Sequence, residues 1–180
     1  MTGDFSRMNV YRPEERRLVL RLLAYWDDLR NDRDYPRADD IDARMIGDDW
    51  AQCFLLRLTG TSLGAGTSLG AGVSLGESQL LHVGDGLLGD LPDGAPATLA
   101  RVPETALLHH AAGFAAQTLS KGVPVSLGGE AALSDGKTLF RSILLPLSND
   151  GAKIDHLLGA VNGRPVGADT TVDIGEPTGA

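Results

Sequence analysis

The residues with the clearest chemical potential form a glycine-rich stretch at 59–66. It reads Thr-Gly-Thr-Ser-Leu-Gly-Ala-Gly and follows an apolar run. This spacing is typical of turns in which glycines let backbone amides approach a pyrophosphate at the start of a helix. One hypothesis is therefore a nucleotide-dependent oxidoreductase that uses Gly60, Gly64 and Gly66.

The sequence around this stretch argues against that hypothesis. Residues 61–66 are repeated identically at 67–72, and a degenerate copy follows at 73–78. Gly and Ser continue where a dinucleotide-binding turn would start a helix. A Tyr-x-x-x-Lys catalytic pair is also missing, because all three tyrosines precede the glycines. We expect residues 60–76 to be a Gly/Ser-rich loop that grew by tandem duplication.

The histidines and the cysteine are the other candidates for chemistry. His109 and His110 are adjacent and would point about 100° apart on a helix. One helical histidine could ligate a haem, but no haem-attachment motif accompanies it. We expect one of the two to face solvent and the other to pack on a sheet. Cys53 is the single cysteine, which excludes an intramolecular disulfide and a thiolate metal cluster. Burial in an apolar strand would raise its pKa and reduce its reactivity.

Composition limits the kind of partner. The chain has 180 residues, 42% of them hydrophobic, and a net charge of −8. Such a length fits one domain, and the negative charge argues against nucleic acids and anionic membrane surfaces. No apolar run approaches the ~20 residues that span a bilayer, and the N-terminus shows no secretory signal. The expected location is the cytoplasm.

Periodicity predicts the elements that position these groups. Helical spacing of apolar residues indicates two helices, and Gly122 stands where the second would end. Alternating or continuous apolar runs indicate strands. The predicted helices are 13–31 and 103–120, and the predicted strands are 53–58, 79–83, 123–133, 139–147 and 154–161.

The last two strands are predicted to form a β-hairpin. They flank an Asn-Asp-Gly turn in which Gly151 can adopt a positive φ. Pro146 has no N–H, so it belongs near the end of its strand. We expect residues 1–12 to be a flexible N-terminus, 13–163 to be one domain, and 164–180 to be a disordered tail.

Several short blocks together resemble a known family. They are Leu-Ala-Tyr-Trp-Asp-Asp-Leu-Arg at 23–30, Pro-Arg-Ala-Asp-Asp-Ile-Asp at 36–42, Leu-Leu-Pro-Leu at 144–147 and Leu-Leu-Gly-Ala at 157–160. Across 15–163 the chain resembles the bacterial PAS-like family of small single-domain proteins, formerly a domain of unknown function. The resemblance implies an α+β fold: a five-stranded antiparallel sheet with helices on one face, plus an N-terminal helix that packs outside the domain or mediates dimerisation.

The resemblance also implies where a ligand or cofactor would sit, namely between the sheet and helix 103–120. The implied cavity residues could equally be plain core, because apolar side chains at such spacings occur in any packed domain. These candidates are Leu107, Ala111, Phe114, Phe140 and Leu145. A flavin-reactive domain of this family would need a cysteine on a helix, so the strand position of Cys53 argues against that mode. The cofactor stays open, with haem and flavin disfavoured.

The first functional hypothesis is therefore a non-enzymatic sensory or adaptor domain. It would bind a small ligand, or a signalling protein such as a histidine kinase, through the sheet or the N-terminal helix, and a homodimer is possible. A ligand or partner would act by shifting the packing of helix 13–31 against the sheet. The candidate partner surface is Arg17, Arg21, Trp26 and Arg30. The oxidoreductase remains the alternative from a different class.

Overall fold

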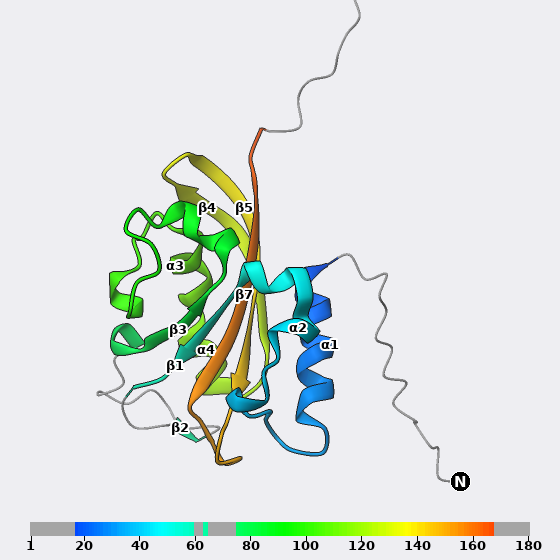
Figure 1. The fold of residues 1–180 in the computed structure, drawn as a ribbon. Coiled ribbons are helices and arrows are strands. Elements are labelled where there is room, and N and C mark those ends of the chain that lie inside the picture. The colour runs from blue at the N-terminus through cyan, green and yellow to red at the C-terminus, as the bar shows by residue number, and fades with distance from the viewer. Residues whose placement is uncertain (1–16, 60–62, 65–74, 168–180) are drawn as a thin grey trace, which may run out of the picture.

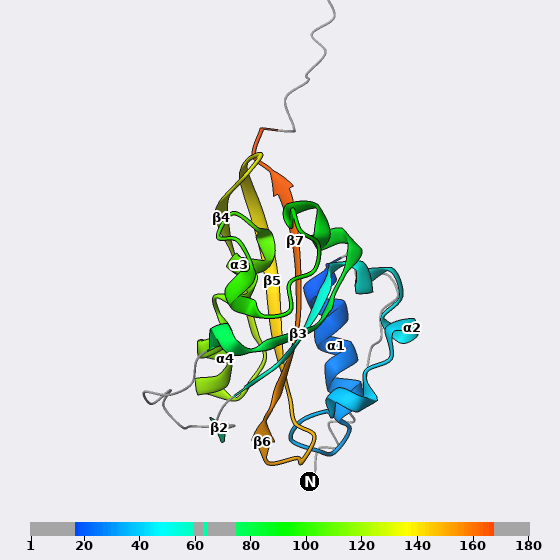
Figure 2. The same cartoon turned by 60° about the vertical axis from the view of Figure 1, so that its left-hand side comes forward.

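A five-stranded antiparallel sheet forms the centre of the molecule (Figure 1). The computed structural model describes residues 17–59, 63–64 and 75–167. The strand order is β3-β1-β7-β5-β4, so the first and last strands of the sheet in sequence lie side by side at its centre. The five strands are β3 (Gln79–Val83), β1 (Cys53–Arg57), β7 (His156–Pro165), β5 (Gly136–Leu147) and β4 (Val125–Leu133). This arrangement confirms the predicted α+β class and the five-stranded antiparallel sheet. The resemblance implied helices on one face and an N-terminal helix outside the domain, whereas α1 (Leu18–Arg30) packs on the opposite face of the sheet as part of the core (Figure 2).

Helices cover both faces of this sheet. Figure 2 shows α3 and α4 on one side of the sheet and α1 and α2 on the other. The α-helices are α1 (Leu18–Arg30), α2 (Ala43–Ile46), α3 (Leu107–Ala112) and α4 (Ala115–Lys121). Short 3₁₀ helices span Ala38–Asp40, Gly47–Gln52, Leu75–Glu77, Asp85–Asp90 and Leu99–Arg101. In the described residues, no helix is long and apolar enough to cross a bilayer.

The predicted hairpin is present, with a longer connection than a tight turn. Strand β5 pairs with β7 from Leu147 opposite His156 to Thr138 opposite Pro165. Gly151 has a φ of 80°, as predicted. The Asp150 carboxylate accepts hydrogen bonds from the amides of Ala152 and Lys153, both at 2.8 Å. Within the connection, β6 (Lys153–Ile154) pairs with the two residues of β2 (Leu63–Gly64).

A close approach of a ring to the backbone fixes the packing on the α3 face. Phe54 of β1 lies directly over Gly159 of β7, and a Cβ at Gly159 would overlap the Phe54 ring. Phe54 is fully buried. The glycine is therefore required by packing, because an added methyl group would have to displace an aromatic ring held in the core.

On the opposite face, α1 packs against the sheet as part of the core. Leu18, Val19, Leu22 and Trp26 are its buried residues. The indole Nε1–H of Trp26 donates to the carbonyl oxygen of Pro146 at 2.8 Å. Pairing of β4 with β5 ends at Leu144, opposite Val125, the first residue of β4, so the Pro146 carbonyl lies beyond this ladder. The Trp26 side chain thus supplies the hydrogen-bond donor for a backbone carbonyl near the end of β5.

Other predicted elements differ in detail from those observed. The predicted helix 103–120 is two helices, α3 and α4, separated at Gly113 and Phe114. Gly122 ends α4 with a φ of 63°, as predicted. Strand β7 continues to Pro165, past the predicted domain boundary at 163, because Thr138 pairs with Pro165 there. The predicted flexible N-terminus lies outside the described residues, as does most of the repeat loop and of the tail.

The Trp26–Pro146 hydrogen bond predicts a specific loss of stability. Trp26→Phe keeps an aromatic ring in place but leaves the Pro146 carbonyl without its donor. We expect the free energy of unfolding, measured by urea denaturation, to fall by about 1–3 kcal/mol. Leu20→Ala, on the exposed side of the same helix, should change it by less than about 0.5 kcal/mol. Equal stabilities of Trp26→Phe and wild type would contradict this role.

Candidate functional site

Most of the predicted cavity residues are packed core residues. Leu107, Ala111 and Phe140 come together between α3 and the sheet, and they are 8%, 0% and 7% exposed. Phe114 is partly buried at the start of α4 and packs against the hydrophobic core. Leu145 does not lie with the first three. Leu145 lies opposite Leu158 in the ladder, and alternation places both on the α1 face. The structure therefore brings Leu107, Ala111 and Phe140 together and places Leu145 on the opposite face of the sheet.

The histidines are distributed over separate positions. His110 packs beside Phe140, with ring centroids 6.1 Å apart, and its neighbour His109 meets it edge-on at an interplanar angle of 87°. The Nε2 of His110 is buried without a hydrogen-bond partner in the described part of the chain. His82 stacks on Trp50 at a centroid distance of 3.9 Å. Among the described residues, no three His, Cys, Asp or Glu side chains form a group suited to a metal ion.

The predicted partner surface on α1 needs one correction. Trp26 is 8% exposed, because its indole is directed at the sheet by the hydrogen bond to Pro146. It therefore belongs to the core and offers no surface to a partner. Arg30 lies over the Trp26 ring, 5.5 Å from its centroid, and pairs with Asp27 at 2.8 Å.

The other two arginines of that surface stay near the start of α1. Arg17 is exposed at the N-cap position. Arg21 holds Asp49 through two hydrogen bonds of 2.6 Å. Such a two-point guanidinium–carboxylate pair fixes both side chains. Arg21 therefore ties α1 to the segment before β1, which is a structural role.

Cys53 behaves as its sequence context predicts. It is the first residue of β1, fully buried, and its thiol donates to the backbone oxygen of Asp49 at 3.2 Å. Burial, and to a lesser extent the negative charge of Asp49, raise the pKa of this thiol to about 12. The thiol is therefore not poised as a nucleophile near neutral pH.

This pKa shift predicts a stability change at alkaline pH. The folded protein favours the neutral thiol, whereas an unfolded cysteine ionises with a pKa of about 8.5. Between these two values the unfolded state binds fewer protons, so stability falls as pH rises. We expect the loss of unfolding free energy between pH 7 and pH 10 to be smaller in Cys53→Ala than in wild type.

Urea denaturation at the two pH values measures this difference. Burial also raises the pKa of Tyr25 and Tyr35, and both tyrosines are present in the variant and in wild type. The comparison therefore isolates the cysteine. Equal losses in the two proteins would show that Cys53 ionises normally when folded.

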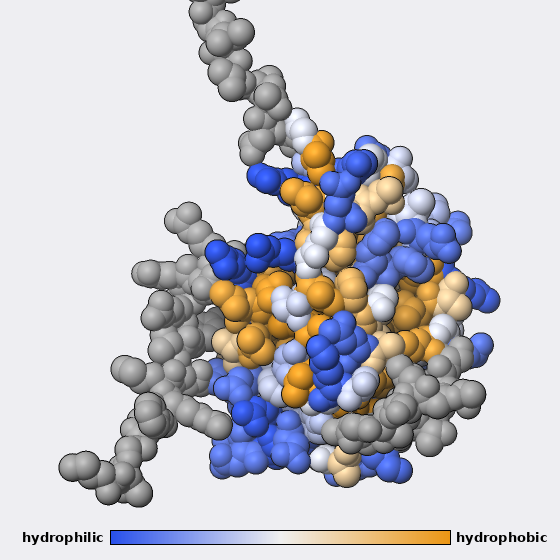
Figure 3. Space-filling view, turned by 180° about the vertical axis from the view of Figure 1, so that it is seen from behind, coloured by the Kyte–Doolittle hydropathy of each residue, from blue (hydrophilic) through white to orange (hydrophobic). Residues whose placement is uncertain are grey.

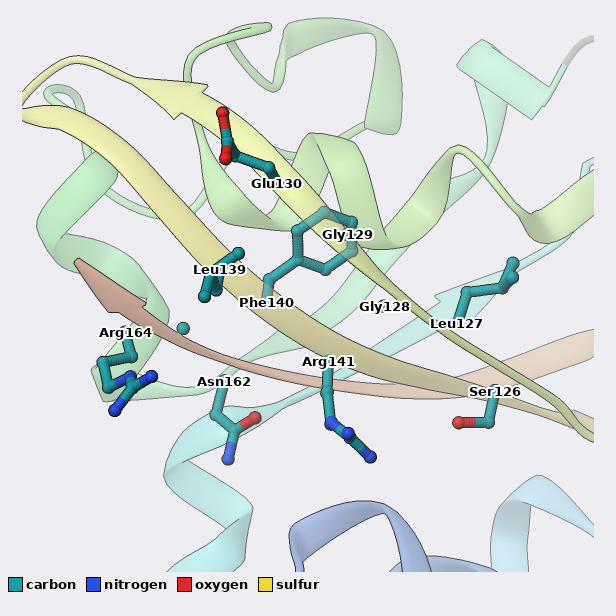
Figure 4. Close-up of a pocket in the computed structure, with 11 residues that line it drawn as sticks. Ser126, Leu127, Gly128, Gly129, Glu130, Leu139, Phe140, Arg141, Asn162 and Arg164 are labelled. Atoms are coloured by element: carbon teal, nitrogen blue, oxygen red, sulfur yellow. The ribbon is translucent and has the colours of Figure 1, made fainter. Parts of the chain in front are cut away.

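A groove lies on the α1 face, over the outer half of the sheet. Its volume is about 860 Å³, and it is bounded by β4, β5 and β7. We call it the open groove and define it by the residues on its floor. They are Ser126, Gly128, Leu139, Arg141, Asn162 and Arg164. In Figure 4 the side chains of Ser126, Arg141, Asn162 and Arg164 extend to one side of the strands, whereas the Phe140 ring points to the other.

The register explains this shared direction. Arg141 lies opposite Gly128 on one side and Asn162 on the other. Leu139 lies opposite Arg164, so the two arginines are diagonal neighbours on one face. Both are exposed. The site therefore presents two guanidinium groups and an amide beside an exposed leucine, and Glu130, which also lines the groove, is paired with Lys137.

The difference in length between helix and strand explains why the groove is uncovered. The 13 residues of α1 span about 20 Å at about 1.5 Å per residue. The 12 residues of β5 span about 40 Å at about 3.4 Å each. Since Trp26 fastens α1 near Pro146, the helix covers the inner half of the strand. The outer half remains bare in the described part of the chain.

Sequence reasoning did not identify Arg141, Asn162 or Arg164. A signal was nevertheless present: Arg141 interrupts an apolar run, and Asn162 follows another, at matching distances from the hairpin turn. Matching polar positions on paired strands indicate a shared exposed face. The prediction of two continuous apolar strands hid this change from buried to exposed residues.

The chain was compared with protein families, curated proteins and solved structures. No family model matches the chain, and no curated protein matches it. Among solved structures, the light state of the blue-light photoreceptor Aureochrome1 LOV aligns with a TM-score of 0.38 and 17% identity. The alignment covers 63% of this chain and 87% of that one.

Proposed function

We propose that the chain is a non-enzymatic PAS-like adaptor domain of the bacterial family that it resembles. It acts in signal transduction in the cytoplasm and binds a signalling protein, such as a histidine kinase, through the open groove. One observation carries the proposal: the α3 face of the sheet is filled by the domain's own side chains, whereas the outer α1 face, within the described residues, carries a groove lined by Arg141, Asn162 and Arg164.

The filled face favours a protein partner over a ligand held in the interior. Ala111 is 0% exposed, and Leu107 and Phe140 lie below 10%. A Cβ at Gly163 would already lie 3.3 Å from Leu107 and closer still to Thr138. A small molecule bound there would have to displace close-packed side chains, at the cost that repacking a core entails.

The composition of the surface also favours a protein partner. Figure 3 shows the molecule from behind, where hydrophobic residues gather across the middle with hydrophilic residues among them. Two exposed apolar side chains, Leu139 (44%) and Val166 (50%), come from neighbouring strand ends beside the two arginines. Mixed apolar and arginine-bearing surfaces are typical of protein interfaces.

The oxidoreductase alternative stays a prediction without support. Of its glycines, Gly64 pairs with Lys153 in the short β2–β6 ladder, and Gly60 and Gly66 lie outside the described residues. No observation in the described part of the chain favours a bound dinucleotide over the adaptor role.

Site-specific photocrosslinking in the source cell tests the adaptor role. A benzophenone amino acid is placed at Leu139, in the open groove, or at Leu81, which is 51% exposed on β3 at the other edge of the sheet. We expect irradiation to join the Leu139 variant to one dominant protein, identified by mass spectrometry. The Leu81 variant should give little or none of that adduct.

Two outcomes would contradict the proposal. Equal adducts from both positions would mean that the groove has no special role. Absence of any adduct from Leu139, with the variant folded and expressed as wild type, would mean that no partner occupies the groove. An adduct with a second copy of the chain would replace the adaptor by a homodimer.

A further inference from the structure

We infer that the open groove recognises an extended acidic segment of the partner, which adds to the free edge of β4 and places a carboxylate on Arg141. The inference rests on the proposed function and names the chemistry of the partner at that site.

The edge of β4 offers the backbone half of this recognition. Strand β4 stands last in the sheet order and pairs with β5 along all nine of its residues. No strand pairs with its other side in the described part of the chain. An edge strand presents a row of N–H and C=O groups that an extended segment can pair with, and such strand addition is a recurrent mode of peptide recognition.

Gly128 opens the path from that edge to Arg141. It lies directly opposite Arg141 in the ladder, and a Cβ there would come 3.0 Å from the Phe140 oxygen and 3.4 Å from Arg141 Cγ. A residue added opposite Gly128 would lie two strand spacings, about 10 Å, from the Arg141 backbone. A glutamate and an arginine side chain together bridge that distance over the bare glycine.

Charge selects an acidic segment over other extended chains. Arg141 is exposed, and within the described residues its guanidinium has no hydrogen-bond or ion-pair partner. Arg164 adds a second positive charge diagonally across β7, and Asn162 an amide. The acidic Glu130 nearby is paired with Lys137 at 2.8 Å. On a chain of net charge −8, Arg141 is an exposed positive charge on the groove face.

The two faces of β4 define the pattern of the segment. On the groove face an added strand meets Ser126, Gly128 and Glu130; on the other face it meets Val125, Leu127 and Ala131, which are buried or half-buried. Side chains of an added strand alternate in the same way. The best-matched segment therefore places an acid opposite Gly128, directed at Arg141, with apolar residues on either side of it and a neutral residue opposite Glu130.

A synthetic peptide tests this inference on the full chain. The probe is fluorescein-labelled Thr-Thr-Val-Glu-Val-Thr-Thr with blocked ends, and its dissociation constant is measured by fluorescence anisotropy. We expect saturable binding, and amide shifts concentrated on β4 in two-dimensional NMR spectra. The matching peptide with Gln in place of Glu should bind at least about tenfold more weakly, as expected for loss of close charge pairs.

Matched variants separate the groove from general electrostatics. Arg141→Glu should weaken binding by at least about tenfold, with Arg141→Gln in between. Arg44→Glu makes the same charge change on α2, where the side chain is 94% exposed, and should leave binding within about twofold of wild type. Since both arginines are exposed, neither change should alter the circular dichroism spectrum.

The outcomes are decisive in either direction. Equal binding of the Glu and Gln peptides, equal loss in the Arg141 and Arg44 variants, or no binding at all overturns the inference. Tighter peptide binding after conversion of the sequence's own acids Asp169, Asp173 and Glu176 to amides would also overturn it, because the chain itself would then be the occupant. Crosslinking from Leu139 without peptide binding would keep the adaptor role and reject only the acidic strand.

Discussion

The ten-residue antiparallel pairing of β5 with β7 is the constraint on which the rest of the structure depends. It lies inside the sheet, so both helical layers pack against it. On one face Gly159 admits the ring of Phe54, and on the other Pro146 receives the indole of Trp26. A register slip of one residue would exchange the two faces, moving Arg141 into the core. The pairing thereby fixes which surface is sealed and which is open.

The open surface follows from a mismatch of lengths. A 13-residue helix cannot cover a 12-residue strand, because a helix rises less than half as far per residue. The uncovered part could have been apolar, which would favour aggregation or a permanent interface. Instead it carries Arg141, Asn162 and Arg164 around Leu139. That mixture suits a reversible contact, and Gly128 keeps the approach to Arg141 free of side chains.

The sequence predicted most of the fold and little of the site, for physical reasons. Periodicity identified the strands and α1, and Gly122 and Gly151 took the positive φ angles expected of them. It missed the break at Gly113, because the apolar stripe continues across it. It could not tell that Trp26 is buried, since an aromatic residue on a helix stripe fits core or interface alike. The groove depends on which face α1 covers, and that is decided by a contact across 120 residues of sequence.

Thiol labelling distinguishes the closed α3 face of the sheet from the half-open α1 face. Cys53 is buried with a pKa of about 12, so in the native protein only an introduced cysteine should react with a thiol reagent. We expect the cysteine of Asn162→Cys to react with a thiol reagent in the native protein as fast as an unfolded cysteine does. Ala111→Cys should react only on unfolding. Fast labelling of Ala111→Cys would show that the α3 face is not closed. Protection of Asn162→Cys would show that the groove is covered.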